Sequence, residues 1–146
     1  MQKFERFWEV RGRGFTDEEW DLICAEVSMV LEECPVDLVG PFGTGKPNVN
    51  GVEISFTGKD GADGFFFYKA ASGMCSCDTE GKPYDEVVVS VLAIAKRIAG
   101  DILDVPGFLD QSSLRRIYAA WETLPKGWTL KSVEKLWNSL SGGPGT

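Results

Sequence analysis

The chain has 146 residues, with 15 basic and 22 acidic side chains, a net charge of −7, four cysteines and no histidine. This length suits one domain with its own core, and a hydrophobic content of 43% argues against disorder. The acidic balance does not favour nucleic-acid binding, which relies on cations that displace counterions from phosphates; it suits a basic protein partner. Apolar runs fall short of the roughly 20 residues that span a bilayer, and the N-terminus lacks a signal-peptide core, so we expect a cytoplasmic protein with reduced thiols.

The first two predicted elements are a strand and a helix. Residues 3–11 are rich in aromatic side chains and predict a strand. Thr16 and Glu19 have the spacing of a capping box, in which each side chain bonds a free backbone N–H at a helix start. Apolar residues then recur at helical spacing until Pro35, so the pattern predicts a helix over residues 17–34.

Three strand-forming segments follow this helix. Residues 36–39 predict a short strand. Val52, Ile54 and Phe56 alternate with polar residues, which is the period of a half-buried strand. Residues 65–68 predict the returning strand, and together these segments indicate an antiparallel hairpin or meander.

A second helix is predicted to begin at Pro83, whose missing N–H would have no partner there, and to end at a C-cap at Gly100. Acidic residues in its first turn complement the helix dipole. Its predicted buried stripe consists of Val87, Val88, Val91, Leu92, Ala95 and Ile98. The preceding residues 72–82 indicate irregular structure, and residues 102–105 predict one more short strand.

The C-terminal part of the sequence has the periodicity of two further helices. We therefore predict an α+β fold, with a small antiparallel sheet and two main helices packed on one face, in a core domain of residues 1–107. A C-terminal helical pair over residues 108–141 is expected to pack on this core. The glycine-rich tail, residues 142–146, should be mobile.

The segment Gly40-Pro-Phe-Gly-Thr-Gly-Lys46 contains the Gly-x4-Gly-Lys spacing of a phosphate-binding loop. Such a loop needs a Ser or Thr after the lysine and a helix whose N-terminus faces the phosphates. Here Pro47 replaces the hydroxyl, and the residues that follow predict a strand. We therefore interpret the segment as a glycine-rich connection between two strands.

The cysteines indicate neither a metal site nor a disulfide. Structural zinc needs four ligands, and Cys75 and Cys77 supply two without any histidine. Cys24 and Cys34 lie about 15 Å apart on one predicted helix, on its apolar face. We expect no metal and no cofactor, with a reactive Cys77 as the alternative.

The residues that usually carry catalysis are missing. Without histidine the common general base and the Ser–His and Cys–His nucleophile pairs are absent, so a non-enzymatic role is favoured. Arg6, Arg11 and Arg13 cluster near the N-terminus, either as a nucleic-acid contact or as solvated strand surface. The net charge favours solvated surface.

The aromatic residues are more numerous than a small core needs. Among them Trp8, Trp121, Trp128 and Trp137 favour a protein-binding surface, because aromatic side chains make good interface anchors. The alternative is that these tryptophans pack the C-terminal helical pair onto the sheet.

The stretch Cys77-Asp-Thr-Glu-Gly-Lys-Pro-Tyr-Asp85, which leads into an apolar helix, resembles a family of small uncharacterised phage-encoded proteins. The family pattern is Cys-Lys-Thr-x-x-Lys-Pro-Tyr-Asp, and glycines and prolines like those of residues 40–47 precede it. Asp78 stands where the family has lysine, and Pro106-Gly107 replaces a Ser-Asp-Gly. The resemblance covers residues 15–105 and implies a viral, bacteriophage context in the host cytoplasm, without implying an activity.

The same stretch provides the candidate ligand-binding residues, Cys77, Thr79, Lys82, Tyr84 and Asp85. They gather at the start of the second predicted helix, where backbone N–H groups are free to bind an anion or a peptide carboxylate. The alternative is that they start the helix while the tyrosine packs on the sheet. We call this group the Cys77–Asp85 corner.

These observations favour a non-enzymatic phage-type accessory protein that binds and modulates a host or phage protein. One alternative is a structural component of a virion or another large assembly. Another is a small enzyme or ligand-binding protein that uses the Cys77–Asp85 corner. The sequence predicts a protein partner and no membrane; it does not identify the partner, the host or the oligomeric state.

Overall fold

The computed structural model of the protein describes residues 5–34, 36–59 and 63–105. The elements in chain order are β1 (Glu5–Val10), α1 (Asp17–Glu33), β2 (Leu38–Val39), β3 (Asn48–Val49), β4 (Glu53–Gly58), β5 (Phe65–Tyr68), β6 (Cys75–Asp78), α2 (Tyr84–Ala99), a 3-10 turn (Gly100–Ile102) and β7 (Leu103–Asp104). A mixed α+β fold with antiparallel strands is confirmed. The helical pair predicted for residues 108–141 and the tail at residues 142–146 lie outside the described residues.

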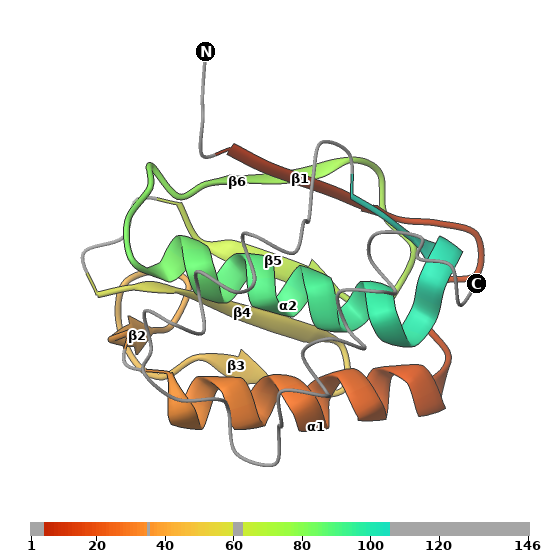
Figure 1. Ribbon diagram of the computed structural model, residues 1–146, viewed down its shortest axis with the longest axis horizontal. Helices are drawn as coiled ribbons and strands as arrows, with labels where there is room; N and C mark the ends of the chain where they lie inside the picture. The colour runs from red at the N-terminus through yellow and green to blue at the C-terminus, as the bar shows by residue number, and fades with distance from the viewer. Residues whose placement is uncertain (1–4, 35, 60–62, 106–146) are drawn as a thin grey trace, which may run out of the picture.

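The strands form two antiparallel groups, and helices α1 and α2 pack against each other (Figure 1). In the first group β1 lies between β6 and β7, and its register with β6 places Trp8 opposite Cys75. In the second group β4 pairs with β2, β3 and β5, and Phe56 lies opposite Phe65. The N-terminal strand is therefore the central strand of its group.

The two faces of the strands differ because side chains alternate along a strand. The face toward the helices carries the core, in which Trp8, Phe56, Phe65 and Phe67 are at most 1% exposed. We call the opposite side the outer face. Its strand positions are Glu5, Phe7 and Glu9 of β1, Glu53, Ser55 and Thr57 of β4, Phe66 and Tyr68 of β5, and Ser76 and Asp78 of β6, of which only Ser55 and Thr57 are buried.

Helix α1 begins and ends close to its predicted limits. The capping box is formed, since the Glu19 N–H donates to Thr16 Oγ1 at 3.1 Å and the Thr16 N–H donates to Glu19 Oε1 at 2.9 Å. The ring of Trp20 lies 5.7 Å from that of Phe15 and 5.9 Å from that of Phe67. These contacts fix the first turns of the helix to the sheet.

Helix α2 follows Pro83 and ends at Gly100, whose φ of +62° suits glycine. Its buried surface is wider than the predicted stripe, since Val89, Ser90 and Ala93 are also buried. The helix packs both on α1 and on the core face of the strands, so more than one of its sides is covered. This explains why its sequence is apolar almost all round.

Three sequence-based expectations are corrected. Residues 72–82 are not wholly irregular, because β6 forms there by pairing with β1. Val52 does not share the buried face of β4 and is 65% exposed. It lies in a turn, where Asn50 Oδ1 accepts hydrogen bonds from the N–H groups of Val52 and Glu53 at 3.0 Å each.

Trp8 is not a surface anchor, because it is 1% exposed and its ring centroid lies 5.0 Å from that of Phe65. The other three tryptophans of this prediction, at positions 121, 128 and 137, lie outside the described residues.

We expect Gly14→Ala to lower the free energy of unfolding by roughly 1–3 kcal/mol. Gly14 has a φ of +75°, and an added Cβ would lie 2.8 Å from Ala71 N and from Lys69 O. Urea titration followed by circular dichroism measures the loss. The matched control is Gly51→Ala, whose Cβ would meet no atom within 4 Å and which should change stability by at most about 0.5 kcal/mol. Equal losses in the two variants would contradict this packing.

Candidate functional site

A buried ion pair holds the Cys77–Asp85 corner. Arg6 donates from Nε to Asp85 Oδ1 at 2.8 Å and from Nη2 to Asp85 Oδ2 at 2.6 Å. The hydroxyl of Thr79 donates to Asp85 Oδ1 at 2.6 Å. Asp85 is 5% exposed and lies in the first turn of α2, where the helix dipole favours a carboxylate. The Asp85 carboxylate is therefore bound to β1, and no local sequence pattern connects the two.

The other side of the corner is built around the backbone carbonyl of Asp63. This oxygen accepts hydrogen bonds from Tyr84 Oη at 2.7 Å, from Thr57 Oγ1 at 3.0 Å and from Cys77 Sγ at 3.8 Å. Burial raises the pKa of Tyr84, and burial raises the pKa of the Cys77 thiol to about 12. The thiolate is the reactive form of cysteine, so the burial of Cys77 and its raised pKa argue against the alternative of a reactive thiol.

The five candidate residues of the corner thus lie together, but they offer little surface to a ligand. Cys77, Thr79 and Tyr84 are 0% exposed, and their polar groups bond within the protein. Lys82 is half-buried, and its N–H donates to the carbonyl of Thr79 at 3.0 Å. The geometry favours a corner that starts the helix, with the tyrosine packed on the sheet; ligand binding there stays a prediction.

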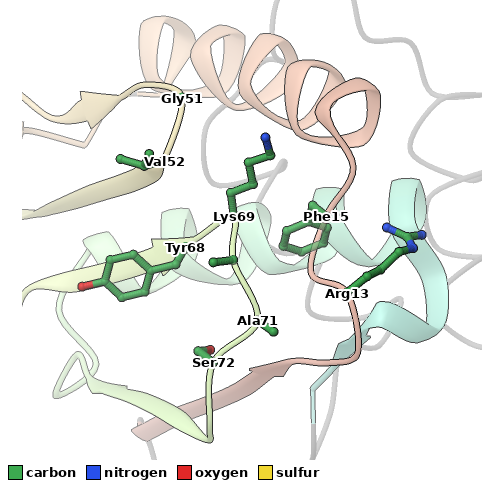
Figure 2. Close-up of a pocket in the computed structure, with 9 residues that line it drawn as sticks. Arg13, Phe15, Gly51, Val52, Tyr68, Lys69, Ala71 and Ser72 are labelled. Carbon is green, nitrogen blue, oxygen red and sulfur yellow. The ribbon is translucent and has the colours of Figure 1, made fainter.

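A pocket of about 600 Å³ opens beside the end of β5 (Figure 2). It is lined by Arg13, Phe15, Gly51, Val52, Tyr68, Lys69, Ala70, Ala71 and Ser72. Its volume lies within the range of roughly 300–1,000 Å³ that is usual for ligand-binding pockets. Figure 2 shows Tyr68 and Arg13 on opposite sides, with Lys69 and Phe15 between them. Three separate segments line the pocket, so no local motif signals it in the sequence.

Both cations at this pocket are paired with carboxylates from the first turn of α1. Arg13 Nη1 donates to Glu19 Oε1 at 2.9 Å, and Lys69 Nζ forms an ion pair with Asp17. The hydrogen bond from Arg13 lowers the pKa of Glu19, and the hydrogen bond from Lys69 lowers the pKa of Asp17. The positive charges of Arg13 and Lys69 are therefore largely neutralised by these carboxylates.

Three aromatic rings cross the outer face next to the pocket, and we call Phe42, Phe66 and Tyr68 the aromatic row. Tyr68 stacks on Phe66, with centroids 6.4 Å apart and an interplanar angle of 15°. Phe66 in turn lies 5.6 Å from Phe42, centroid to centroid. Phe42 is 87% exposed and Tyr68 is 39% exposed. The period-2 pattern of residues 65–68 is the signal that places Phe66 and Tyr68 on one face; nothing in the sequence brings Phe42 to them.

Phe42 belongs to the glycine-rich loop, which connects β2 with β3 as predicted. The loop closes on itself, since Gly40 N–H donates to Gly45 O at 3.2 Å and Gly43 N–H donates to Gly40 O at 2.9 Å. A strand and not a helix follows it. The loop therefore lacks the helix N-terminus that a phosphate-binding loop uses.

The N-terminal arginines do not form a basic patch. Arg6 binds Asp85, Arg11 binds Glu9 at 3.3 Å and Asp104 at 2.8 Å, and Arg13 binds a carboxylate of α1. Each guanidinium therefore lies beside at least one carboxylate. This pattern supports the interpretation of the cluster as charge-paired strand and loop surface.

Neither the described side chains nor the comparisons with known proteins identify a function. Within residues 5–34, 36–59 and 63–105, no three cysteine or acidic side chains are grouped to hold a metal ion. The helices of this described part are also too short or too polar to cross a bilayer. No family model, curated protein or solved structure matches the chain. The geometry of the chain itself must therefore support any functional proposal.

We expect Asp85→Asn to lower the free energy of unfolding by about 3 kcal/mol, because it removes the negative charge from a buried ion pair whose Arg6 and Asp85 side chains are 15% and 7% exposed. Urea unfolding at pH 7 measures this loss. Asp17→Asn is the control, since its carboxylate also pairs with a cation but its side chain is 87% exposed, and its effect should stay within about 1 kcal/mol. A loss for Asp85→Asn no larger than the control's would show that the buried pair contributes little.

We expect the free energy of unfolding to fall less between pH 7 and pH 3 in Glu19→Gln than in the wild type. The pKa of Glu19 is lowered in the folded state, so its contribution is present above the unfolded pKa and is lost as the pH falls through the folded pKa. Urea titrations at pH 7 and pH 3 give the difference for each protein. Glu18→Gln, in the same turn and exposed, is the control. If the stability of Glu19→Gln depended on pH as strongly as that of the wild type, the bonds of Glu19 to Arg13 and in the capping box would not be the source of this dependence.

Proposed function

We propose that this protein is a non-enzymatic accessory protein that binds and modulates another protein through the aromatic row and the adjoining pocket. The observation that carries the proposal is the aromatic row itself, in which successive rings are in contact and two, Phe42 and Tyr68, are 87% and 39% exposed. Single exposed apolar residues are ordinary, but contiguous ones mark interaction sites. Aromatic side chains are also the usual anchors of protein interfaces.

The pocket extends this surface, because Tyr68 belongs to both. A partner that covers Phe42 and Phe66 would place one of its side chains in the pocket beside Tyr68. The pocket walls combine apolar Phe15 and Val52 with polar Ser72 and two paired cations, which suits a side chain with both apolar and polar parts.

The wider context of the proposal comes from the sequence. The resemblance of the segment from Cys77 to Asp85 supports a phage-type protein that acts in the host cytoplasm on a host or phage protein. The two main helices packed on one face of the sheet, and a helical pair over residues 108–141 packed on the core, belong to the same proposal. The corner itself is a weaker candidate site, because its polar groups bond within the protein.

We expect Phe42→Ser with Tyr68→Ser to abolish capture of the partner. The tagged full chain and this double variant are incubated with lysate from host and infected cells, and captured proteins are quantified by mass spectrometry. Both positions are exposed, so the fold should persist, and circular dichroism verifies it. The control is Leu22→Ser, which replaces an apolar residue of α1 that is 57% exposed.

The proposal predicts one dominant protein that the wild type and Leu22→Ser retain and the double variant loses. Equal capture by all three proteins would contradict binding through the aromatic row. Recovery of virion proteins as the row-dependent partners would favour the structural alternative. Turnover of any substrate by the purified chain would contradict a non-enzymatic role.

A further inference from the structure

We propose that the outer face binds an arginine-containing segment of the partner; this inference rests on the proposed function and specifies the chemistry of the partner. The first observation is the charge of the face. Its strand positions contribute the carboxylates of Glu5, Glu9, Glu53 and Asp78. Within β1, β4, β5 and β6 the one basic residue is Arg6, which is bound to Asp85 on the helical side.

Of the cations that flank these strands, Arg11 and Lys69 are paired with carboxylates, and Lys59, which follows β4, is exposed. Arg11 compensates Glu9, but it also binds Asp104, so it serves two carboxylates. Lys69, which directly follows β5, is paired with Asp17. Asp78 Oδ1 accepts the N–H of Glu80 at 2.9 Å, a hydrogen bond that leaves its negative charge in place. The outer face is therefore acidic and complements a basic partner.

The second observation is that aromatic rings lie directly beside the carboxylates. Glu53 and Tyr68 are partners in the β4–β5 register, so their side chains are cross-strand neighbours with Cβ atoms about 4.5–5.5 Å apart. On β1, Phe7 is 39% exposed and lies between Glu5 and Glu9. A group that stacks on the ring of Tyr68 or Phe7 would therefore lie within reach of a carboxylate.

This combination favours arginine over lysine. A guanidinium is planar, stacks on an aromatic face and at the same time donates hydrogen bonds in its plane to a carboxylate. A guanidinium on the Tyr68 ring would reach Glu53 in this way. The ammonium of lysine is a strongly hydrated point charge that lacks the planar stacking surface.

Aromatic sheet faces also stack the bases of single-stranded nucleic acids, which makes nucleic acid the competing occupant. Those faces combine their rings with cations that follow the phosphate backbone. Here the strands of the outer face carry carboxylates instead. A basic protein segment is therefore the occupant that the charges support.

The test is a titration of the full-length, ¹⁵N-labelled chain with three probes, followed by ¹H–¹⁵N NMR. The probes are the peptide Gly-Arg-Gly-Arg-Gly-Arg-Gly, its lysine counterpart and a uridine octanucleotide. We expect the arginine peptide to shift amide signals of β4 and β5 and to bind about two- to five-fold more tightly than the lysine peptide. The octanucleotide should leave these signals unchanged.

Two variants and a control then locate the interaction. Glu53→Gln and Tyr68→Leu should each weaken arginine-peptide binding by about two- to five-fold. Glu32→Gln, which removes an exposed carboxylate of α1, should leave it unchanged. The inference is overturned if the arginine peptide fails to bind or binds no better than the lysine peptide. Shifts centred on α1, equal weakening by Glu32→Gln, or octanucleotide binding at the aromatic row would overturn it as well.

The outcomes also separate this inference from the proposed function. If the double variant at Phe42 and Tyr68 loses the cellular partner while the arginine peptide does not bind, the protein-binding function stands and the partner lacks this chemistry. If the arginine peptide binds at Glu53 and Tyr68 while partner capture is independent of the aromatic row, the proposed function fails although the face has the predicted preference.

Discussion

The ion pair between Arg6 and Asp85 joins the first strand to the second helix across 79 positions of the chain. Arg6 comes from the central strand of one group, so its position also fixes β6 and β7 on either side. Taking two charges out of water is costly unless both are paired and hydrogen-bonded, and here Thr79 adds a further hydrogen bond to Asp85. A misplaced β1 would leave a buried carboxylate at the start of α2, so the pair specifies one arrangement of strand and helix.

The carbonyl of Asp63 makes the corresponding connection for the second group of strands. Its three donors come from β4, β6 and α2, namely Thr57, Cys77 and Tyr84. One backbone oxygen therefore links both strand groups to the same helix turn that Asp85 occupies. Polar groups that hydrogen-bond to one another inside the fold are less available to a ligand, which favours a structural role for the Cys77–Asp85 corner.

Local signals predicted the parts of the fold that local interactions determine. The capping box at Thr16 and the glycine at position 100 fixed helix ends, because their partners lie within a few residues. Strand β6 escaped prediction because Cys-Ser-Cys-Asp has no strong strand pattern and forms by pairing with β1, far away in the sequence. The grouping of the corner residues was predictable, but the burial of Asp85 was not, since the charge that allows it comes from Arg6.

On the outer face, by contrast, the arrangement of Phe42 adds little to the stability of the core. Phe42 is 87% exposed and contributes almost nothing to the core, yet a whole loop is shaped to hold it against Phe66. That loop contains Gly43 and Gly45 in left-handed conformations, at φ of +94° and +76°, and glycines are entropically costly to order. Core stability does not explain this arrangement. The glycines that resemble a phosphate-binding loop are better explained as the means by which the chain places an exposed aromatic ring against Phe66.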